Sequence, residues 1–422
     1  MRIAVAKERR EGERRVAATP DSVKKLIALG AEIAIETGAG AGASIADAAF
    51  EAAGATIAKD YAAAVAGADI LLKVRAPLTK AESRRKDKID EISPLPEGCY
   101  VIGMLAPHGD PKALDAYAAQ SVTAMTLELV PRITRAQAMD VLSSQSNLAG
   151  YKAVIIAADH FDRAFPMMMT AAGTIPPARV VIVGAGVAGL QAIATARRLG
   201  AIVSAFDVRA VAKEQVQSLG ASFVEVEGAE NLETAGGYAK EAGEDYKKRQ
   251  AAALSEHLKK QDIVVTTALI PGRPAPRIVT EEMIKGMKPG AIIVDMAVEA
   301  GGNCDLSKPD EIVEAHGVRI IGQTNLPSSL AIDASQFYAR NLVAYLTPLI
   351  DPESKSVKLD WEDEIVAATV LTHDGKIVHP DFAAAPNAPA AKAETPAAEP
   401  PSEEPPSEAP ISDEPKSDEQ GA

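Results

Sequence analysis

The segment Val180-Val-Ile-Val183, followed at once by Gly184-Ala-Gly-Val-Ala-Gly189, decides the fold of this chain. The apolar run predicts a buried strand, and Leu190–Leu199 predicts the helix that follows the glycines. In this setting Gly184 permits a tight turn, Gly186 lets the backbone approach a pyrophosphate, and Gly189 lets helix and strand pack closely. The free N–H groups at the start of the helix favour a phosphate. The segment therefore predicts a dinucleotide-binding α/β domain.

An acidic residue follows the next predicted strand. The strand Ala201–Phe206 is followed by Asp207, eighteen residues after Gly189. A carboxylate at this place accepts hydrogen bonds from the adenosine ribose hydroxyls and repels a 2′-phosphate. It therefore favours NAD(H) over NADP(H), although the nearby Arg209 weakens this discrimination. The alternative is a purely structural glycine turn followed by a surface aspartate.

Short apolar runs alternate with helical stretches along most of the chain. The strand Arg2–Ala6, a helix that starts at Pro20 after the capping residue Thr19, and the strand Ala31–Glu36 predict a parallel β-α-β start. Further strands are expected at Ala68–Val74, Tyr100–Leu105, Ser121–Leu127, Ile202–Phe206, Ser222–Val226, Ile263–Thr267, Ile292–Met296 and Arg319–Gly322. We expect Ala136–Ala158 to form one long helix.

These elements predict an α/β protein of two Rossmann-like domains with mainly parallel sheets, plus a disordered C-terminal tail. We assign residues 1–135 to the first domain, completed by residues 330–382, because the helix expected at Ala331–Leu349 could return to it. Residues 136–329 form the NAD(H)-binding domain. Residues 383–422 form the tail, since positions 384–422 hold nine prolines and nine acidic residues with almost nothing apolar.

Composition excludes several classes of protein. A net charge of −14 argues against nucleic acid as a partner, because phosphate binding needs a basic face. The two cysteines, Cys99 and Cys304, lie far apart and do not suggest a disulfide scaffold. We find neither a secretory signal nor an apolar run of the ~18 residues that a membrane span needs. We therefore expect a soluble, cytoplasmic protein.

The chain offers one dense polar segment and no acid–base or metal motif. The six histidines lack ligand spacing, so we expect no metal site. Polar side chains crowd the stretch Arg132–Asn147 ahead of and into the expected long helix. From composition alone this stretch could bind an amide, or it could be a solvated helix start capped by Thr134. A second stretch, Thr234–Ala239, reads alone as a mobile loop.

Five segments together resemble one family, the NAD(H)-binding alpha component of proton-translocating transhydrogenase. They are Arg132–Tyr151, Phe165–Pro177, Gly184–Leu199, Thr234–Glu241 and Asp295–Cys304, and the likeness extends over roughly residues 1–380. The resemblance implies that NADH binds between two Rossmann-like domains and passes hydride to NADP(H) on a separate component. A membrane-spanning component couples that transfer to proton movement. It also implies a homodimer that associates peripherally with the inner face of the membrane through its partners.

The resemblance also implies roles for individual residues. It assigns hydride-transfer roles to Arg132, Gln137, Asp140, Ser143 and Tyr238, and NAD(H) contacts to Arg132, Ile133, Thr134, Gln137, Ser143, Gly184, Gly186, Val187, Gly189, Asp207, Val208, Arg209, Gly237, Gln250 and Leu269. Direct hydride transfer between nicotinamides needs orientation and exclusion of water rather than a general acid. The absence of an acid–base motif agrees with this chemistry.

Two other functions compete with this interpretation. The chain also resembles alanine dehydrogenases, whose substrate-binding Arg and Lys match Arg15 and Lys73. However, the catalytic His of that family falls near Met104, and its Asp falls at Glu299, although His108 lies close by. Met cannot relay a proton. The second alternative is a non-catalytic NAD(H)-binding protein, because a fold alone does not establish catalysis.

Overall fold

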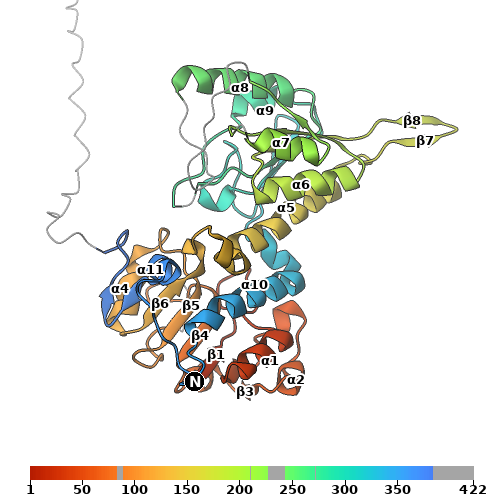
Figure 1. The fold of residues 1–422 in the computed structure, drawn as a ribbon. Coiled ribbons are helices and arrows are strands. Elements are labelled where there is room, and N and C mark those ends of the chain that lie inside the picture. Colours follow the sequence, from red (N-terminus) through yellow and green to blue (C-terminus); the bar gives the residue numbers. More distant parts are fainter. Residues whose placement is uncertain (83–88, 210, 227–242, 271, 384–422) are drawn as a thin grey trace, which may run out of the picture. The chain divides into compact units, whose positions relative to one another are not determined.

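The computed structural model describes residues 1–82, 89–209, 211–226, 243–270 and 272–383, and these contain two parallel sheets with helices packed on them (Figure 1). The first sheet has the strand order β3-β2-β1-β4-β5-β6, and all its neighbours pair in parallel. Its strands are β1 (Arg2–Val5), β2 (Glu32–Glu36), β3 (Thr56–Ala58), β4 (Ile70–Arg75), β5 (Tyr100–Met104) and β6 (Thr123–Thr126), and its first four helices are α1 (Pro20–Ala28), α2 (Asp47–Ala52), α3 (Tyr61–Val65) and α4 (Pro111–Ala119).

The second sheet has the order β11-β10-β9-β12-β13-β15-β14 and is parallel except for the final pair, β14 and β15. Its strands are β9 (Arg179–Val183), β10 (Ile202–Phe206), β11 (Ser222–Phe223), β12 (Ile263–Thr266), β13 (Ile292–Asp295), β14 (Ile312–Ala315) and β15 (Val318–Ile321), and its helices are α6 (Val187–Arg198), α7 (Val211–Ser218), α8 (Glu244–Leu258) and α9 (Glu281–Lys285). Both sheets bear out the expected α/β class. The tail from residue 384 lies outside the described residues.

The long helix differs from the expectation in where it begins. Residues Thr134–Met139 form a 3₁₀ helix, and the α-helix α5 runs only from Val141 to His160. The side chain of Asp140 caps α5 by accepting the Ser143 N–H at 2.8 Å. Thr134 makes no such cap, so the proposed capping role of Thr134 is wrong. A strong cap at Asp140 starts a new helix there, because it satisfies donors that a continuous helix would bond internally.

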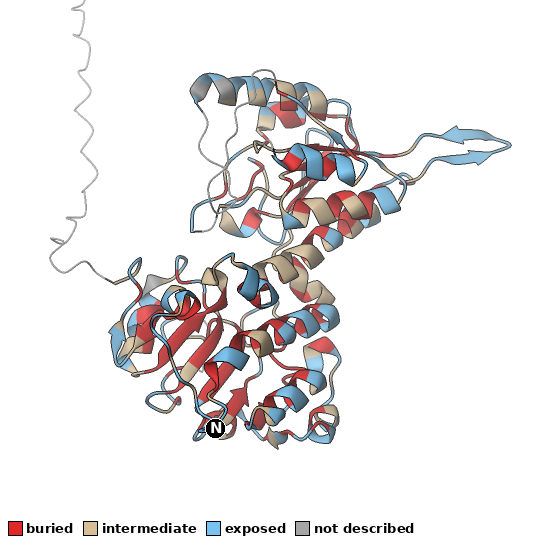
Figure 2. Cartoon of the chain, in the orientation of Figure 1, coloured by how far each residue is buried: buried red, intermediate tan, exposed pale blue. Residues whose placement is uncertain are grey.

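The helix α10 (Ala331–Leu346) packs into the core beneath the first sheet, as expected for a returning segment. Tyr338, Leu342 and Tyr345 are fully buried together with Ile3, Leu72 and other residues of the first sheet. The chain then continues through a 3₁₀ turn, Thr347–Leu349, the short helix α11 (Glu364–Thr369) and the hairpin strands β16 (Thr372–His373) and β17 (Lys376–Ile377). Figure 2 shows the strands of the first sheet as a buried layer between more exposed helices.

A hairpin that the sequence did not predict extends away from the rest of the ribbon (Figure 1). Its strands are β7 (Met168–Thr170) and β8 (Gly173–Ile175), and all six residues are exposed. Met167, Met168, Met169 and Ile175 expose between 45% and 74% of their surface. Among the described helices, none is both long and apolar enough to cross a bilayer.

Candidate nucleotide site

The glycine turn between β9 and α6 has the geometry that the sequence predicted. Gly184 has a φ of +98°, which favours glycine, and a Cβ at Gly189 would clash with the Gly184 carbonyl oxygen. A Cβ at Gly186 would meet no atom of the described residues within 4 Å, so the turn is open toward them at this point. The N–H groups that begin α6 border this open space, since Gly186 is the residue before the helix. This arrangement suits a phosphate.

A second close contact explains the glycine inside α5. A Cβ at Gly150 would clash with the backbone of Ala188 in α6. Only a glycine allows α5 to lie this close to the first turn of α6. Helix α5 therefore holds the helix whose N-terminus borders the candidate phosphate position.

Asp207 lies where β10 ends and is tied into the same turn. Its carboxylate accepts the N–H of Ala185 at 2.7 Å and that of Arg209 at 2.9 Å. The Arg209 guanidinium donates to both carboxylate oxygens of Asp207 at 2.9 Å. The carboxylate that the sequence predicts for ribose recognition thus lies beside the turn, where it is already paired with Arg209.

The segment after β12 forms the other border of the glycine turn. The Thr267 N–H donates to the Val183 carbonyl at 2.8 Å, and the Thr267 hydroxyl donates to the Gly184 carbonyl at 2.9 Å. Leu269 follows and is 48% exposed, as is Val187 at 41% on the first turn of α6. Exposed apolar side chains beside a phosphate position are suited to contact the flat faces of a nucleotide.

The polar loop that precedes α5 presents side chains to solvent. Arg132 and Gln137 are exposed, whereas Ala136 and Met139 bury into the first core. Asp140 and Ser143 bond to one another, with the Ser143 hydroxyl donating to Asp140 at 2.5 Å. Arg135, which the sequence analysis did not single out, forms a two-point ion pair with Asp363 at 2.7 and 3.0 Å.

Three further predicted contacts have different outcomes. Gly237 and Tyr238 lie outside the described residues. Gln250 lies on α8, and its side-chain nitrogen is buried with no hydrogen-bond acceptor among the described residues. A buried donor without an acceptor is costly in a folded protein. The side-chain nitrogen of Gln250 is therefore a candidate donor for a ligand, in agreement with the contact that the resemblance implies.

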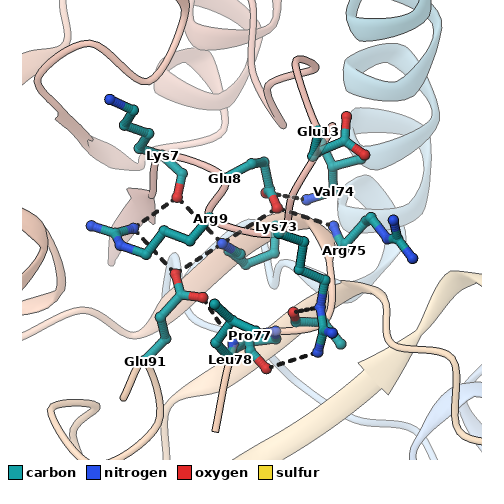
Figure 3. A network of polar contacts seen from close by, with 12 residues as sticks. Lys7, Glu8, Arg9, Glu13, Lys73, Val74, Arg75, Pro77, Leu78 and Glu91 are labelled. Atoms are coloured by element: carbon teal, nitrogen blue, oxygen red, sulfur yellow. Dashed lines mark hydrogen bonds and ion pairs between the residues drawn. The ribbon is translucent and has the colours of Figure 1, made fainter. Parts of the chain in front are cut away.

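The carboxyl edge of the first sheet holds a network of charged side chains instead of an open turn (Figure 3). Lys73, in the second half of β4, is 1% exposed, and its ammonium lies 3.0 Å from Glu91 and 3.4 Å from Glu8. Glu8 also accepts the Val74 N–H at 2.7 Å. Arg9 joins the network through Glu91 at 3.2 Å. The network is satisfied within the chain.

Arg15 is likewise neutralised by its own chain. Its guanidinium donates to both oxygens of Glu13 at 2.7 and 2.8 Å, and also to Gln145 at 2.8 Å. Burial opposes ionisation of Glu13, but the hydrogen bonds and charge of Arg15 outweigh it and lower the pKa of Glu13 to about 2. Burial also opposes the charge on Lys73, yet Glu8 and Glu91 outweigh it and raise the pKa of Lys73.

The positions that correspond to alanine dehydrogenase catalysis carry other side chains. Met104 ends β5, and Glu299 lies exposed in the 3₁₀ turn Val298–Ala300. The ring of His108 packs against Phe382, with centroids 4.9 Å apart. Within the part of the chain that the structure describes, these three side chains therefore do not form a proton relay.

Comparisons with known proteins identify the family of this chain. The model of the alanine dehydrogenase/PNT N-terminal domain matches residues 4–149, and that of the C-terminal domain matches residues 153–380. An NAD(P) transhydrogenase alpha-subunit chain of Rhodospirillum rubrum is 56% identical over 382 residues, which cover 90% of this chain and 98% of that protein. This chain belongs to the family of NAD(P) transhydrogenase alpha subunits.

A solved structure supports the assignment to the transhydrogenase family. The transhydrogenase of Sinorhizobium meliloti superposes with a TM-score of 0.78 at 48% identity, covering 90% of this chain and 100% of that one. Alanine dehydrogenase is a more distant relative, since the enzyme of Mycolicibacterium smegmatis is 29% identical over 385 residues, covering 90% of this chain and 95% of that enzyme. Within the shared fold, the transhydrogenase branch is therefore favoured.

Proposed function

We propose that this chain is the NAD(H)-binding component of a proton-translocating transhydrogenase. It exchanges hydride between NAD(H) in its own site and NADP(H) on a partner component. A membrane-spanning partner couples this transfer to proton movement and holds the chain at the inner face of the membrane. The observation that carries the proposal is the open glycine turn at Gly186 with Asp207 beside it.

The described residues fit NAD(H). The space at Gly186 admits a pyrophosphate against the N–H groups of α6, where a side chain would exclude it. Asp207 faces the same turn and suits a ribose diol. The ribose hydroxyls then replace part of the Arg209 side-chain contacts. The buried nitrogen of Gln250 supplies one further donor without an acceptor among the described residues.

In this mechanism the residues of this chain bind NADH and orient its nicotinamide ring. Bound NADH supplies the hydride. Ile133 and Thr134 flank its nicotinamide, Arg132 contacts the nucleotide, and Ser143 holds the carboxamide. Asp140 fixes the start of α5 and with it the direction of Ser143, to which it bonds at 2.5 Å. Gln137 faces the partner component and brings the two rings together. Orientation of this kind can supply ~7–11 kcal/mol of a barrier without any acid or base.

We propose that residues 1–135 with 330–382, and residues 136–329, act as two domains with the nucleotide between them. The first core contains α10, which supports the return of the chain. Val208 contributes to the ribose contact, whereas Gly237 and Tyr238, which lie outside the described residues, are assigned to the nucleotide and to hydride transfer by the resemblance alone. A nucleotide held between two domains would be shielded from water during the transfer.

We also propose that the chain forms a homodimer. The exposed hairpin β7–β8 supports this, because it carries Met167, Met168, Met169 and Ile175 at its surface. Contiguous exposed apolar side chains on a protein surface mark an interaction site. Sedimentation of the Met169→Glu variant, which introduces a charge at the most exposed methionine, should give monomers. If the variant remained dimeric, the hairpin would not be part of the dimer interface.

The experiment that tests the proposed function has two steps. Calorimetry should first detect NADH binding that is tighter than NADPH binding. The chain should then reduce NADP⁺ in a single turnover, but only after the NADP(H)-binding partner is added. Equal or tighter NADPH binding would contradict the ribose assignment. Binding without transfer in the complete complex would favour a non-catalytic NAD(H)-binding protein.

Alanine dehydrogenase is the second function to test. Arg15 and Lys73 are both paired with carboxylates of their own chain, which leaves them poorly placed to bind a substrate carboxylate. Met104 stands where that chemistry needs a proton relay. The purified chain should therefore produce no NADH from alanine and NAD⁺. Robust alanine-dependent NADH production would overturn the preference for transhydrogenase.

A further inference from the structure

Two buried asparagines hold the two loops to which the proposed site residues belong. Asn303 follows β13 and is fully buried, and Asn341 lies on α10 and is 7% exposed. A buried carboxamide is costly unless its donors and acceptor are satisfied. Both side chains satisfy these groups with backbone or hydroxyl groups of loops that border the proposed nucleotide site. The following inference rests on the proposed function.

Asn303 forms a two-point contact with the segment after β12. Its side-chain oxygen accepts the Ala268 N–H at 3.0 Å, and its side-chain nitrogen donates to the Ala268 carbonyl at 2.9 Å. The same nitrogen donates to the Pro276 carbonyl at 2.8 Å. Ala268 lies between Thr267, which bonds to the glycine turn, and Leu269, a proposed nucleotide contact. Asn303 therefore fixes the path of the backbone that presents Leu269.

Asp295 supports this contact from behind. It is fully buried and accepts four hydrogen bonds, from Thr266, Ala297, Cys304 and Ser307, at 2.6 to 3.0 Å. The bonds join the end of β12 to the residue after Asn303. These bonds hold the loop that carries Asn303 in one conformation. The hydrogen bonds from Asn303 therefore fix the position of Ala268.

Asn341 performs a corresponding task for the polar loop before α5. Its side-chain nitrogen donates to the Ala138 carbonyl at 2.8 Å, and its oxygen accepts the Ser144 hydroxyl at 2.7 Å. Ala138 directly follows Gln137, and Ser144 directly follows Ser143. One carboxamide therefore fixes the spacing between the loop that carries Gln137 and the first turn of α5.

We propose that Asn303 and Asn341 are positioning residues with separable effects. Asn303 sets the segment that binds NAD(H), so its loss weakens binding. Asn341 sets Gln137 and Ser143, so its loss slows hydride transfer while binding persists. Neither side chain touches the reacting atoms in this scheme, since both are buried against backbone.

The test uses the full chain with its NADP(H)-binding partner. Asn303→Ala should raise the Kd for NADH about tenfold, which corresponds to ~1.4 kcal/mol. Asn341→Ala should keep the NADH Kd within about threefold and slow single-turnover transfer at saturating NADH by about 100-fold, the effect of ~1 Å of misplacement. The variants Asn303→Ser and Asn341→Ser introduce a hydroxyl that can donate and accept a hydrogen bond, and they should recover part of each loss.

Matched controls separate positioning from loss of stability. Ile320→Ala removes a fully buried side chain from β15, and Leu346→Ala removes one from the same helix as Asn341. Both should lower the melting temperature and leave the NADH Kd and transfer rate unchanged. The inference is overturned if the asparagine variants match these controls, or if each affects Kd and rate alike. Failure of the unmodified chain to bind NADH would instead reject the proposed function.

Discussion

The two parallel sheets use their carboxyl edges in opposite ways. In the first sheet the edge between β1 and β4 is filled by Lys73, Glu8 and Glu91, which pair with one another in the interior. In the second sheet the edge between β9 and β12 is an open glycine turn, where a Cβ added at Gly186 would meet no atom of the described residues within 4 Å. The same architecture therefore provides one edge that is filled by the chain and one that is left free.

The difference shows what distinguishes a structural edge from a binding edge. In both sheets the strand order reverses there, which is where open α/β sheets bind ligands. Charged groups at the first edge have their partners inside the protein, so a ligand would have to displace them. At the second edge the free N–H groups of a helix start need an acceptor from outside. The position in the fold makes both edges candidate ligand sites, and the side chains at each edge favour the second.

The largest expected effect comes from breaking the filled edge. Lys73→Met leaves Glu8 buried without a cation and leaves Glu91 with Arg9 alone, which should cost about 3–5 kcal/mol of unfolding free energy. Denaturant unfolding measures this loss of free energy. The double variant Lys73→Met/Glu8→Gln should recover part of the loss, because one carboxylate is removed.

A surface pair provides the matched control for this prediction. Lys59 lies 4.0 Å from Asp60, and its side chain is 84% exposed. Lys59→Met should leave the unfolding free energy nearly unchanged, because exposed pairs contribute little. Equal effects of the two lysine substitutions would mean that the first edge is not a closed structural network.

The second prediction concerns a polar side chain that the chain leaves exposed. Gln137→Asn keeps the carboxamide but shortens its reach by one methylene. We expect near-normal NADH binding and single-turnover transfer slowed by about 100-fold with the partner present, because ~1 Å of misplacement can have that effect. Arg132→Ala should impair both steps, since Arg132 is also proposed to contact NADH. Loss of NADH affinity with an unchanged transfer rate in Gln137→Asn would refute this role.

The third prediction probes the open edge directly. Asp207→Ala removes the carboxylate that accepts the Ala185 N–H and is proposed to accept the ribose hydroxyls. NADH binding should weaken by about 1–3 kcal/mol, the usual loss for hydrogen bonds to a charged group. Discrimination against NADPH should fall as well, because the repulsive charge is gone. Calorimetry with both nucleotides measures the ratio, and an unchanged NADH/NADPH ratio would contradict the assignment.

Local sequence patterns predicted the second edge well because its determinants are contiguous. The strand, the glycines and Asp207 lie within 28 residues, Val180 to Asp207, and each has a backbone reason to be there. The first edge was not predictable in this way. Lys73 follows three apolar residues of strand β4, and its partners Glu8 and Glu91 come from distant segments. Only the folded chain reveals that they meet.

Other differences have equally specific causes. The hairpin β7–β8 has no buried face, so the alternation of apolar and polar residues that identifies a strand is missing. The start of α5 was misplaced because Ala136–Met139 suit a helix as well as the residues after Asp140 do, and only geometry shows which residue caps the helix. Asn303 and Asn341 were missed because a single buried amide leaves no repeating pattern in a sequence.

Removal of the tail has the smallest expected effect. It tests whether stability and NADH binding need any part of the chain beyond the two sheets and their helices. The composition of residues 384–422, with nine prolines and nine acidic residues, offers little apolar surface to offset the entropy of ordering. Truncation after Ala383 should therefore leave the melting temperature and the NADH Kd unchanged. Truncation after Asp381 is the informative comparison, because it also removes Phe382, whose ring packs against His108 at 4.9 Å and His379 at 5.1 Å between centroids. Loss of that partly buried ring should cost about 1 kcal/mol of stability, less than full burial of a phenylalanine contributes. A large loss of stability or affinity on truncation after Ala383 would mean that the tail binds to the body, and the nucleotide site would then have to be considered together with it.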